Sequence, residues 1–127
     1  MQKTVFVVDD SDANLTKAKQ ALDGNYRVFT LPSALKLFSI LEKVTPDLIL
    51  LDIEMPEVSG YEAIKTLKSN PRTASIPVIF LTGNIDEKSE KDGFSLGAVD
   101  YIYKPFTETQ LLNRCEIALM PHVASQS

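Results

Sequence analysis

The segment Asp47-Leu48-Ile49-Leu50-Leu51-Asp52 is the most informative about the fold, because it has no polar residue between its two aspartates. A strand with one face in water alternates apolar and polar side chains, whereas a strand covered on both faces is apolar along its whole length. The stretch therefore predicts a central strand that is buried on both faces of a sheet and that ends in Asp52.

Short apolar runs of the same kind lie on either side of this strand. Thr4-Val5-Phe6-Val7-Val8 stops abruptly at Asp9-Asp10. The run Ile76–Thr82 has its proline near the start, where a missing backbone donor is tolerated. Residues 27–30 and the interior of 98–104 complete a set of five predicted strands.

Helical patterns separate these strands and begin at residues that cap helices. Ser33 is expected to cap the second helix. Three pairs have the spacing of a capping box, namely Ser59 with Glu62, Asn84 with Glu87, and Thr107 with Gln110. The expected helices cover residues 12–22, 33–43, 59–69, 84–96 and 107–120.

Strands that alternate with helices predict an α/β domain with a parallel sheet and helices on both faces. In the second helix, the spacing of Leu35, Phe38 and Leu41 predicts the face that packs on the sheet. Ligands of such folds bind at the carboxyl ends of the strands. The functional residues are therefore expected where the strands end.

Composition excludes several classes of protein. The chain has 127 residues, of which 44% are hydrophobic, and this size and composition predict one folded domain. Its single cysteine cannot form an internal disulfide or a zinc cluster, which fits a reducing cytoplasm. The net charge is −4 without a basic stripe, so we expect no binding to nucleic acid. We also expect no signal peptide and no membrane association.

Charged and hydroxyl side chains follow four of the predicted strands. These residues are Asp9, Asp10, Asp52, Thr82 and Lys104. Taken singly, each has an ordinary structural explanation; for example, two adjacent aspartates often start a turn and cap a helix. Three carboxylates at one edge of a sheet would repel one another, and a hard divalent cation, Mg²⁺ or Mn²⁺, is the simplest remedy.

This combination of groups is suited to phosphoryl transfer. A metal ion, an ammonium and a hydroxyl can together neutralise the oxygens of a phosphoryl group. A carboxylate beside them can act as the nucleophile and form an acyl phosphate. Asp52 is the expected nucleophile, because it stands singly on the central strand and is followed by a loop, residues 53–56, whose carbonyls could reach the metal.

The motifs resemble those of response-regulator receiver domains in two-component phosphorelays. They occur in order as Asp9-Asp10, Asp52 with Met55-Pro56 and Ser59-Gly60, Thr82-Gly83, and Lys104-Pro105-Phe106. The resemblance implies a flavodoxin-like three-layer sandwich with five parallel strands in the order 2-1-3-4-5. It assigns residues 1–122 to the receiver domain and leaves 123–127 as a short tail or cut linker.

The resemblance also implies a role for each motif residue. Asp52 would accept phosphoryl from a histidine kinase or a phosphotransfer protein. Asp10 and Asp52 would bind Mg²⁺ directly with the carbonyl of Glu54, whereas Asp9 would act through a bound water. Lys104 would pair with the aspartate or the phosphoryl oxygens, and its bond to Pro105 would be cis.

The remaining implied roles concern switching and lifetime. Thr82 would turn toward the phosphoryl group, and Tyr101 would follow it from an exposed to a buried position. Glu54 and Asn84 would tune the lifetime of the phosphoryl group. The surface of the fourth helix, fifth strand and fifth helix would then contact a downstream protein or an output domain outside this chain, and a phosphorylation-dependent homodimer is left open. Such a chain catalyses only its own phosphorylation and dephosphorylation.

Two alternatives come from other functional classes. A small Mg²⁺-dependent phosphohydrolase with an aspartyl nucleophile would use similar chemistry, and Glu54 stands where its second acid would be. Such enzymes need a cap over the substrate, for which 127 residues leave no room. A flavodoxin-type electron carrier would need a phosphate-binding loop where this chain has Asp9-Asp10-Ser11-Asp12, which would repel a flavin phosphate.

Overall fold

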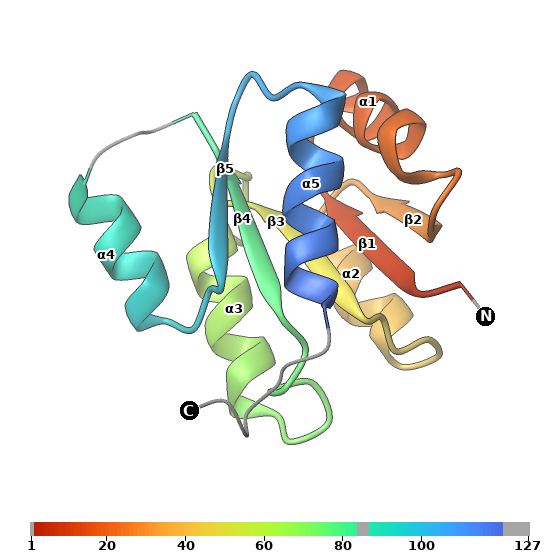
Figure 1. Ribbon diagram of the computed structural model, residues 1–127. Helices are drawn as coiled ribbons and strands as arrows, with labels where there is room; N and C mark the ends of the chain where they lie inside the picture. Colours follow the sequence, from red (N-terminus) through yellow and green to blue (C-terminus); the bar gives the residue numbers. More distant parts are fainter. Residues whose placement is uncertain (1, 84–86, 121–127) are drawn as a thin grey trace, which may run out of the picture.

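A computed structural model of the protein describes residues 2–83 and 87–120 (Figure 1). Five parallel strands form one sheet in the order β2-β1-β3-β4-β5, which confirms the predicted α/β fold and its strand order. The strands are β1 (Thr4–Val8), β2 (Arg27–Leu31), β3 (Leu48–Asp52), β4 (Val78–Thr82) and β5 (Asp100–Tyr103). The helices are α1 (Asp12–Leu22), α2 (Ala34–Leu41), α3 (Gly60–Ser69), α4 (Glu87–Ser95) and α5 (Glu108–Leu119).

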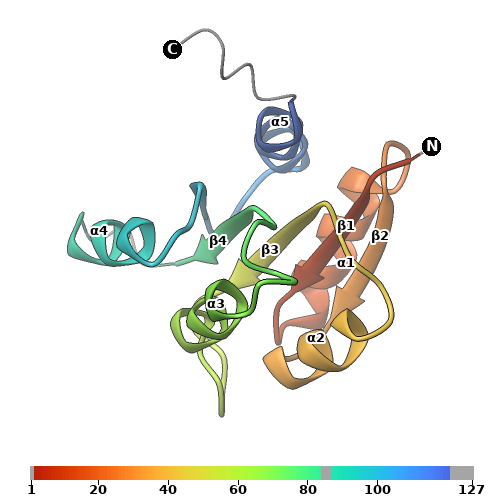
Figure 2. The ribbon, with the colours of Figure 1, turned by 90° about the horizontal axis from the view of Figure 1, so that it is seen from below.

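The sheet has a hydrophobic core on each face. Alternate residues of the central strands point to opposite faces, so that Leu48 and Leu50 pack with α1 and α5 while Ile49 and Leu51 pack with α2 and α3. Figure 2 shows α2 and α3 along one face of the sheet. In the same view α4 lies at the left end of the sheet, near β4. Burial on both faces explains why β1, β3 and β4 have no alternating polar side chains.

The helix starts follow the predicted caps where the structure describes them. The Ser59–Glu62 and Thr107–Gln110 capping boxes are both present, and the Ser33 side chain accepts a hydrogen bond from the backbone N–H of Lys36. Ser11 caps α1 in the same way, although it was not among the predicted caps. The predicted cap at Asn84 lies outside the described residues.

The predicted apolar face of α2 is confirmed at Leu41 and Phe38, which lie in or against the core, and is wrong at Leu35. Leu35 was expected to face the core, but 57% of it is exposed, whereas Ala34, Leu37 and Leu41 are buried. These three residues lie at i, i+3 and i+7, and the small Ala34 allows the first turn to approach the sheet. α2 also ends at Leu41 rather than at Lys43.

The strand register brings the polar residues to one edge of the sheet. β1 pairs with β3 so that Val8 lies beside Leu51, and β3 pairs with β4 so that Asp52 lies beside Leu81. Thr82 at the end of β4 lies beside Tyr103 at the end of β5. No helix within the described ranges is long and apolar enough to cross a membrane.

Candidate functional site

Three carboxylates meet at the carboxyl ends of β1 and β3. Asp9 and Asp10 follow β1, Asp52 ends β3, and one oxygen from each lies within 4.8 Å of the others. Asp9 and Asp52 are buried, whereas Asp10 is exposed to solvent. The predicted acidic cluster is therefore present. Two of its carboxylates are buried, and that of Asp10 lies at the surface, where the cluster opens to solvent.

Lys104 joins the two buried carboxylates. Its Nζ lies 2.9 Å from Oδ1 of Asp52 and 3.0 Å from Oδ2 of Asp9. Burial disfavours the charge of this lysine, but the hydrogen bonds to Asp52 and Asp9 outweigh burial, so the pKa of Lys104 is raised. The peptide bond from Lys104 to Pro105 is cis, as predicted.

Asp9 is anchored to the start of α1. Its Oδ1 accepts a hydrogen bond from the backbone N–H of Ser11 at 2.9 Å, and its Oδ2 accepts one from Nδ2 of Asn14 at 3.3 Å. Asn14 is not among the residues predicted from the sequence, although its place in the first turn of α1 was a usable signal. These bonds, together with Lys104, hold Asp9 in a fixed orientation.

Asp52 has one engaged oxygen and one unengaged oxygen. Oδ1 accepts hydrogen bonds from Lys104 and, at 3.3 Å, from the backbone N–H of Glu54. Oδ2 is buried and has no hydrogen-bond partner in the described part of the chain. Burial raises the pKa of Asp52 to about 7; Lys104 opposes this rise and the charge of Asp9 adds to it.

The donor set fits a hard divalent cation. Every side-chain donor in the cluster is a carboxylate oxygen, the ligand type that Mg²⁺ and Mn²⁺ prefer. The buried Oδ2 of Asp52 lacks a partner, and a cation bound by the cluster would provide one. Because Asp10 is exposed, a cation bound by the cluster could keep some of its waters.

Gly60 allows the loop after Asp52 to fold back on itself. A Cβ at this position would overlap the carbonyl oxygen of Asp52 and would lie 2.7 Å from the Cα of Ile53. The N–H of Gly60 donates to the carbonyl of Ile53 at 2.8 Å. The glycine is thus needed because α3 begins in contact with the backbone of the site.

Thr82 lies at the neighbouring strand end and contacts Glu54. The threonine is fully buried, and its Oγ1 donates a hydrogen bond to Oε2 of the exposed Glu54 at 3.2 Å. The sequence placed Glu54 at the mouth of the site but did not predict this bond, which joins residues 28 positions apart. Asn84, the other predicted lifetime residue, lies outside the described residues.

Tyr101 is buried beneath α4. Only 5% of the residue is exposed, and its ring centroid lies 5.6 Å from that of Phe80 and 5.1 Å from that of Phe94. Of the two positions expected for this side chain, the structure holds the buried one.

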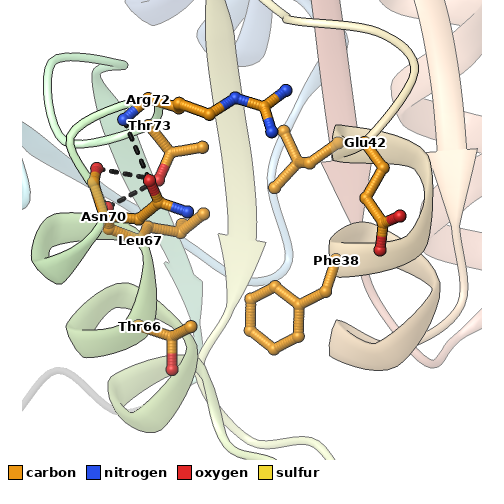
Figure 3. A pocket seen from close by; sticks show the side chains of 8 residues that line it. Phe38, Glu42, Thr66, Leu67, Asn70, Arg72 and Thr73 are labelled. Atoms are coloured by element: carbon orange, nitrogen blue, oxygen red, sulfur yellow. Dashed lines mark hydrogen bonds between the residues drawn. The ribbon is translucent and has the colours of Figure 1, made fainter.

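A separate pocket of about 190 Å³ lies between α2 and α3 (Figure 3). Phe38 and Glu42 line one side of it, and Thr66, Asn70 and Arg72 line the other. These residues come from the second halves of α2 and α3 or from the segments that follow the two helices. The pocket therefore lies away from the carboxyl ends of the strands, where both helices begin. It shares no residue with the acidic cluster.

Comparison with known proteins gives a consistent family. The sequence model described as "Response regulator receiver domain" matches residues 5–116. A probable cyclic di-GMP phosphodiesterase of Vibrio cholerae is 47% identical over 113 residues, which is 89% of this chain and 26% of that protein. The phosphate regulon transcriptional regulatory protein PhoB of Pseudomonas aeruginosa is 34% identical over 118 residues, 92% of this chain and 52% of that protein.

Solved structures agree over nearly the whole chain. The chemotaxis protein CheY4 of Vibrio cholerae superimposes with a TM-score of 0.89 at 26% identity and covers 94% of this chain and 100% of its own. A putative response regulator of Chloroflexus aurantiacus has a TM-score of 0.89 at 30% identity, covering 95% and 100%. The chain thus covers the whole of these two solved chains, whereas it spans about a quarter and about half of the two relatives above.

Proposed function

The chain belongs to the response regulator receiver domain family of two-component signalling, and from this premise we propose that Asp52 accepts the phosphoryl group. The observation that supports this most directly is the buried Oδ2 of Asp52, which has no hydrogen-bond partner among the described residues. The same carboxylate ends the central strand β3 and is held through its other oxygen by Lys104.

The donor would be a phosphohistidine of a histidine kinase or of a phosphotransfer protein. Asp52 would form the new bond to phosphorus while the bond from phosphorus to the imidazole nitrogen breaks and the imidazole leaves. Asp52 must be ionised to attack. Its pKa of about 7 leaves a substantial ionised fraction near neutral pH.

The acidic cluster would hold Mg²⁺, or Mn²⁺ in its place. Asp10 and Asp52 would bind the cation directly, the Glu54 carbonyl would add a third ligand from the protein, and Asp9 would act through a water. When bound, the cation offsets the negative charges of the carboxylates and of the phosphoryl oxygens.

Lys104 would position the acceptor and then stabilise the product. The ammonium holds Asp52 at 2.9 Å and Asp9 at 3.0 Å, which keeps two buried carboxylates close together. Once Asp52 is phosphorylated, the same ammonium can pair with a phosphoryl oxygen.

Thr82 would report the phosphorylation of Asp52 to the rest of the domain. A hydroxyl has one proton to donate, so Thr82 can donate to only one acceptor at a time. It now donates to Glu54, and a phosphoryl group on Asp52 would compete with Glu54 for that proton. This competition would bias the position of Tyr101 and of the surface formed by α4, β5 and α5.

The partner that reads this surface would be a downstream protein or an output domain outside this chain. Identity is 47% to the protein named as a probable cyclic di-GMP phosphodiesterase and 34% to the transcriptional regulator. The higher identity favours an output that acts on cyclic di-GMP. On this proposal the chain itself catalyses only its own phosphorylation and dephosphorylation, and the phosphohydrolase alternative is not favoured, because the family match covers residues 5–116.

Labelling by a small phosphodonor tests the proposal. We expect the protein with Mg²⁺ and acetyl phosphate to gain one phosphoryl group by intact-mass spectrometry, and Asp52→Asn to gain none. The control is Asp23→Asn, which removes an exposed carboxylate at the end of α1 and should label normally. An acid-labile phosphoryl group retained by Asp52→Asn would overturn the assignment.

A further inference from the structure

The ring of Tyr101 reaches from β5 to the underside of α4. Its centroid lies 5.1 Å from that of Phe94 on α4 and 5.6 Å from that of Phe80 on β4, and the ring is stacked with that of Tyr103 at 6.5 Å. Tyr101 is therefore enclosed by aromatic rings on several sides, and its hydroxyl end points to one residue of the helix, Gly93.

Gly93 leaves the space that the end of this ring occupies. A Cβ built at position 93 would overlap the hydroxyl oxygen of Tyr101, would lie 2.6 Å from its Cζ, and would lie 3.0 Å from Cε2 of Phe80. Carbon atoms that are not bonded to each other settle about 3.5–4.0 Å apart. Even alanine therefore does not fit at 93 while Tyr101 holds this position.

The backbone at Gly93 does not itself require glycine. Gly97 has a φ of +110°, which favours glycine, whereas no such φ occurs at Gly93. Glycine is also less favourable than alanine inside a helix. Neither backbone conformation nor helix stability accounts for a glycine at this position in the last turn of α4, and the space taken by Tyr101 does.

We infer that Gly93 is the residue that lets α4 and a buried Tyr101 coexist, so that the two move as one switch element. A side chain at 93 would force either the ring outward or the helix away from the sheet. Phosphorylation that favours the buried ring would therefore also fix the place of α4. The inference rests on the proposed function only in treating Tyr101 as part of the switch.

Tyrosine-ring NMR without any phosphodonor tests the inference. The chain has four tyrosines, and the spectrum of Tyr101→Phe identifies the signal of Tyr101. We expect a soluble paramagnetic agent to leave this signal sharp in the natural sequence and to broaden it in Gly93→Ala. Gly24→Ala is the matched control, because a Cβ at Gly24 meets nothing within 4 Å.

A second pair of variants covers the case in which Gly93→Ala folds poorly. We expect Gly93→Ala to lower the thermal midpoint in the natural background. In a Tyr101→Ala background we expect it to raise the midpoint, because the overlap with Tyr101 is gone, the Phe80 ring can shift into the space left, and alanine is the better helix former. A protected Tyr101 signal in Gly93→Ala, or a change of the same sign in both backgrounds, would overturn the inference. Failure of phosphorylation at Asp52 would leave this result intact and would overturn only the proposed function.

Discussion

Asp52 is a carboxylate with an unusual balance of contacts. Its residue is 1% exposed, one oxygen is bound by an ammonium, and the other has no partner among the described residues. Burial opposes the charge of the carboxylate and Lys104 favours it, so the pKa of about 7 reflects two large opposing effects. If Asp52 is the phosphoryl acceptor as proposed, this incomplete pairing leaves one of its oxygens available to react.

Glu54 is expected to influence Asp52 through Thr82, whose hydroxyl donates a hydrogen bond to the Glu54 carboxylate. We expect Glu54→Ala to slow the loss of phosphoryl from Asp52 about fivefold, because Thr82 would then donate to the phosphoryl group without a competitor, and one such hydrogen bond stabilises by about 1 kcal/mol. The measurement is the decay of the phosphorylated mass after the donor is removed.

Glu116→Ala is the control for this prediction, since it removes an exposed carboxylate from α5, away from the strand ends. An unchanged decay in Glu54→Ala would show that the exposed carboxylate has no part in phosphoryl lifetime.

At the scale of elements, Lys68 ties the end of α3 to the chain that follows it. Its Nζ donates to the carbonyls of Ala74 and Ile76, each at 3.0 Å, and its stem would touch a Cβ placed at Gly97. Burial lowers the pKa of this lysine. Helix α3 and the loop before β4 are therefore connected by one side chain, whose stem lies near the turn before β5.

The lowered pKa of Lys68 gives a pH dependence with a definite sign. Between the folded pKa and the unfolded value of 10.5, the unfolded chain binds more protons than the folded protein, so this group makes stability rise with pH. We expect urea unfolding of Lys68→Met, compared with the natural sequence from pH 7 to pH 11, to lack this contribution. Lys65→Met, a change of an exposed lysine on α3, is the control.

The two lysine variants also differ at neutral pH. We expect Lys68→Met to lose about 1 kcal/mol of stability, because two backbone carbonyls lose a charged donor. If the difference between Lys68→Met and the natural sequence were constant with pH, the titration of Lys68 would not be coupled to folding.

At the scale of the whole molecule, the acidic cluster proposed to bind the cation forms only in the folded chain. Asp10 and Asp52 are 42 positions apart in sequence, and pairing of β1 with β3 brings them together. A cation that binds only the folded state stabilises it, by about 2.7 kcal/mol at a hundred times its dissociation constant. We expect Mg²⁺ to raise the thermal midpoint of the natural sequence.

Asp10→Asn should lose most of this increase in midpoint, because Asp10 is exposed and is expected to bind the cation directly. Asp12→Asn makes the same change of charge two residues away and should keep the increase. Equal responses of the two variants to Mg²⁺ would mean that the cation acts through general screening of charge.

Local features of the chain were sufficient for the elements and for the members of the site. Continuous apolar runs predicted the strands, capping boxes predicted the starts of α3 and α5, and polar residues at strand ends predicted the cluster of Asp9, Asp10 and Asp52. The capping boxes depend on contacts between residues that are close in sequence. The cluster follows from the rule that the carboxyl ends of parallel strands lie at the same edge of the sheet.

Tertiary packing decided what those local features leave open. It set the rotation of α2, which buries Ala34 and exposes Leu35. It also placed Thr82 against Glu54 and the end of Tyr101 against Gly93. Local patterns in the chain were enough to identify which residues gather at the site, because the hydrophobic pattern shows where each strand ends. Only the folded structure decided which atoms of those residues meet, because that depends on how helices and side chains fill the space between distant segments.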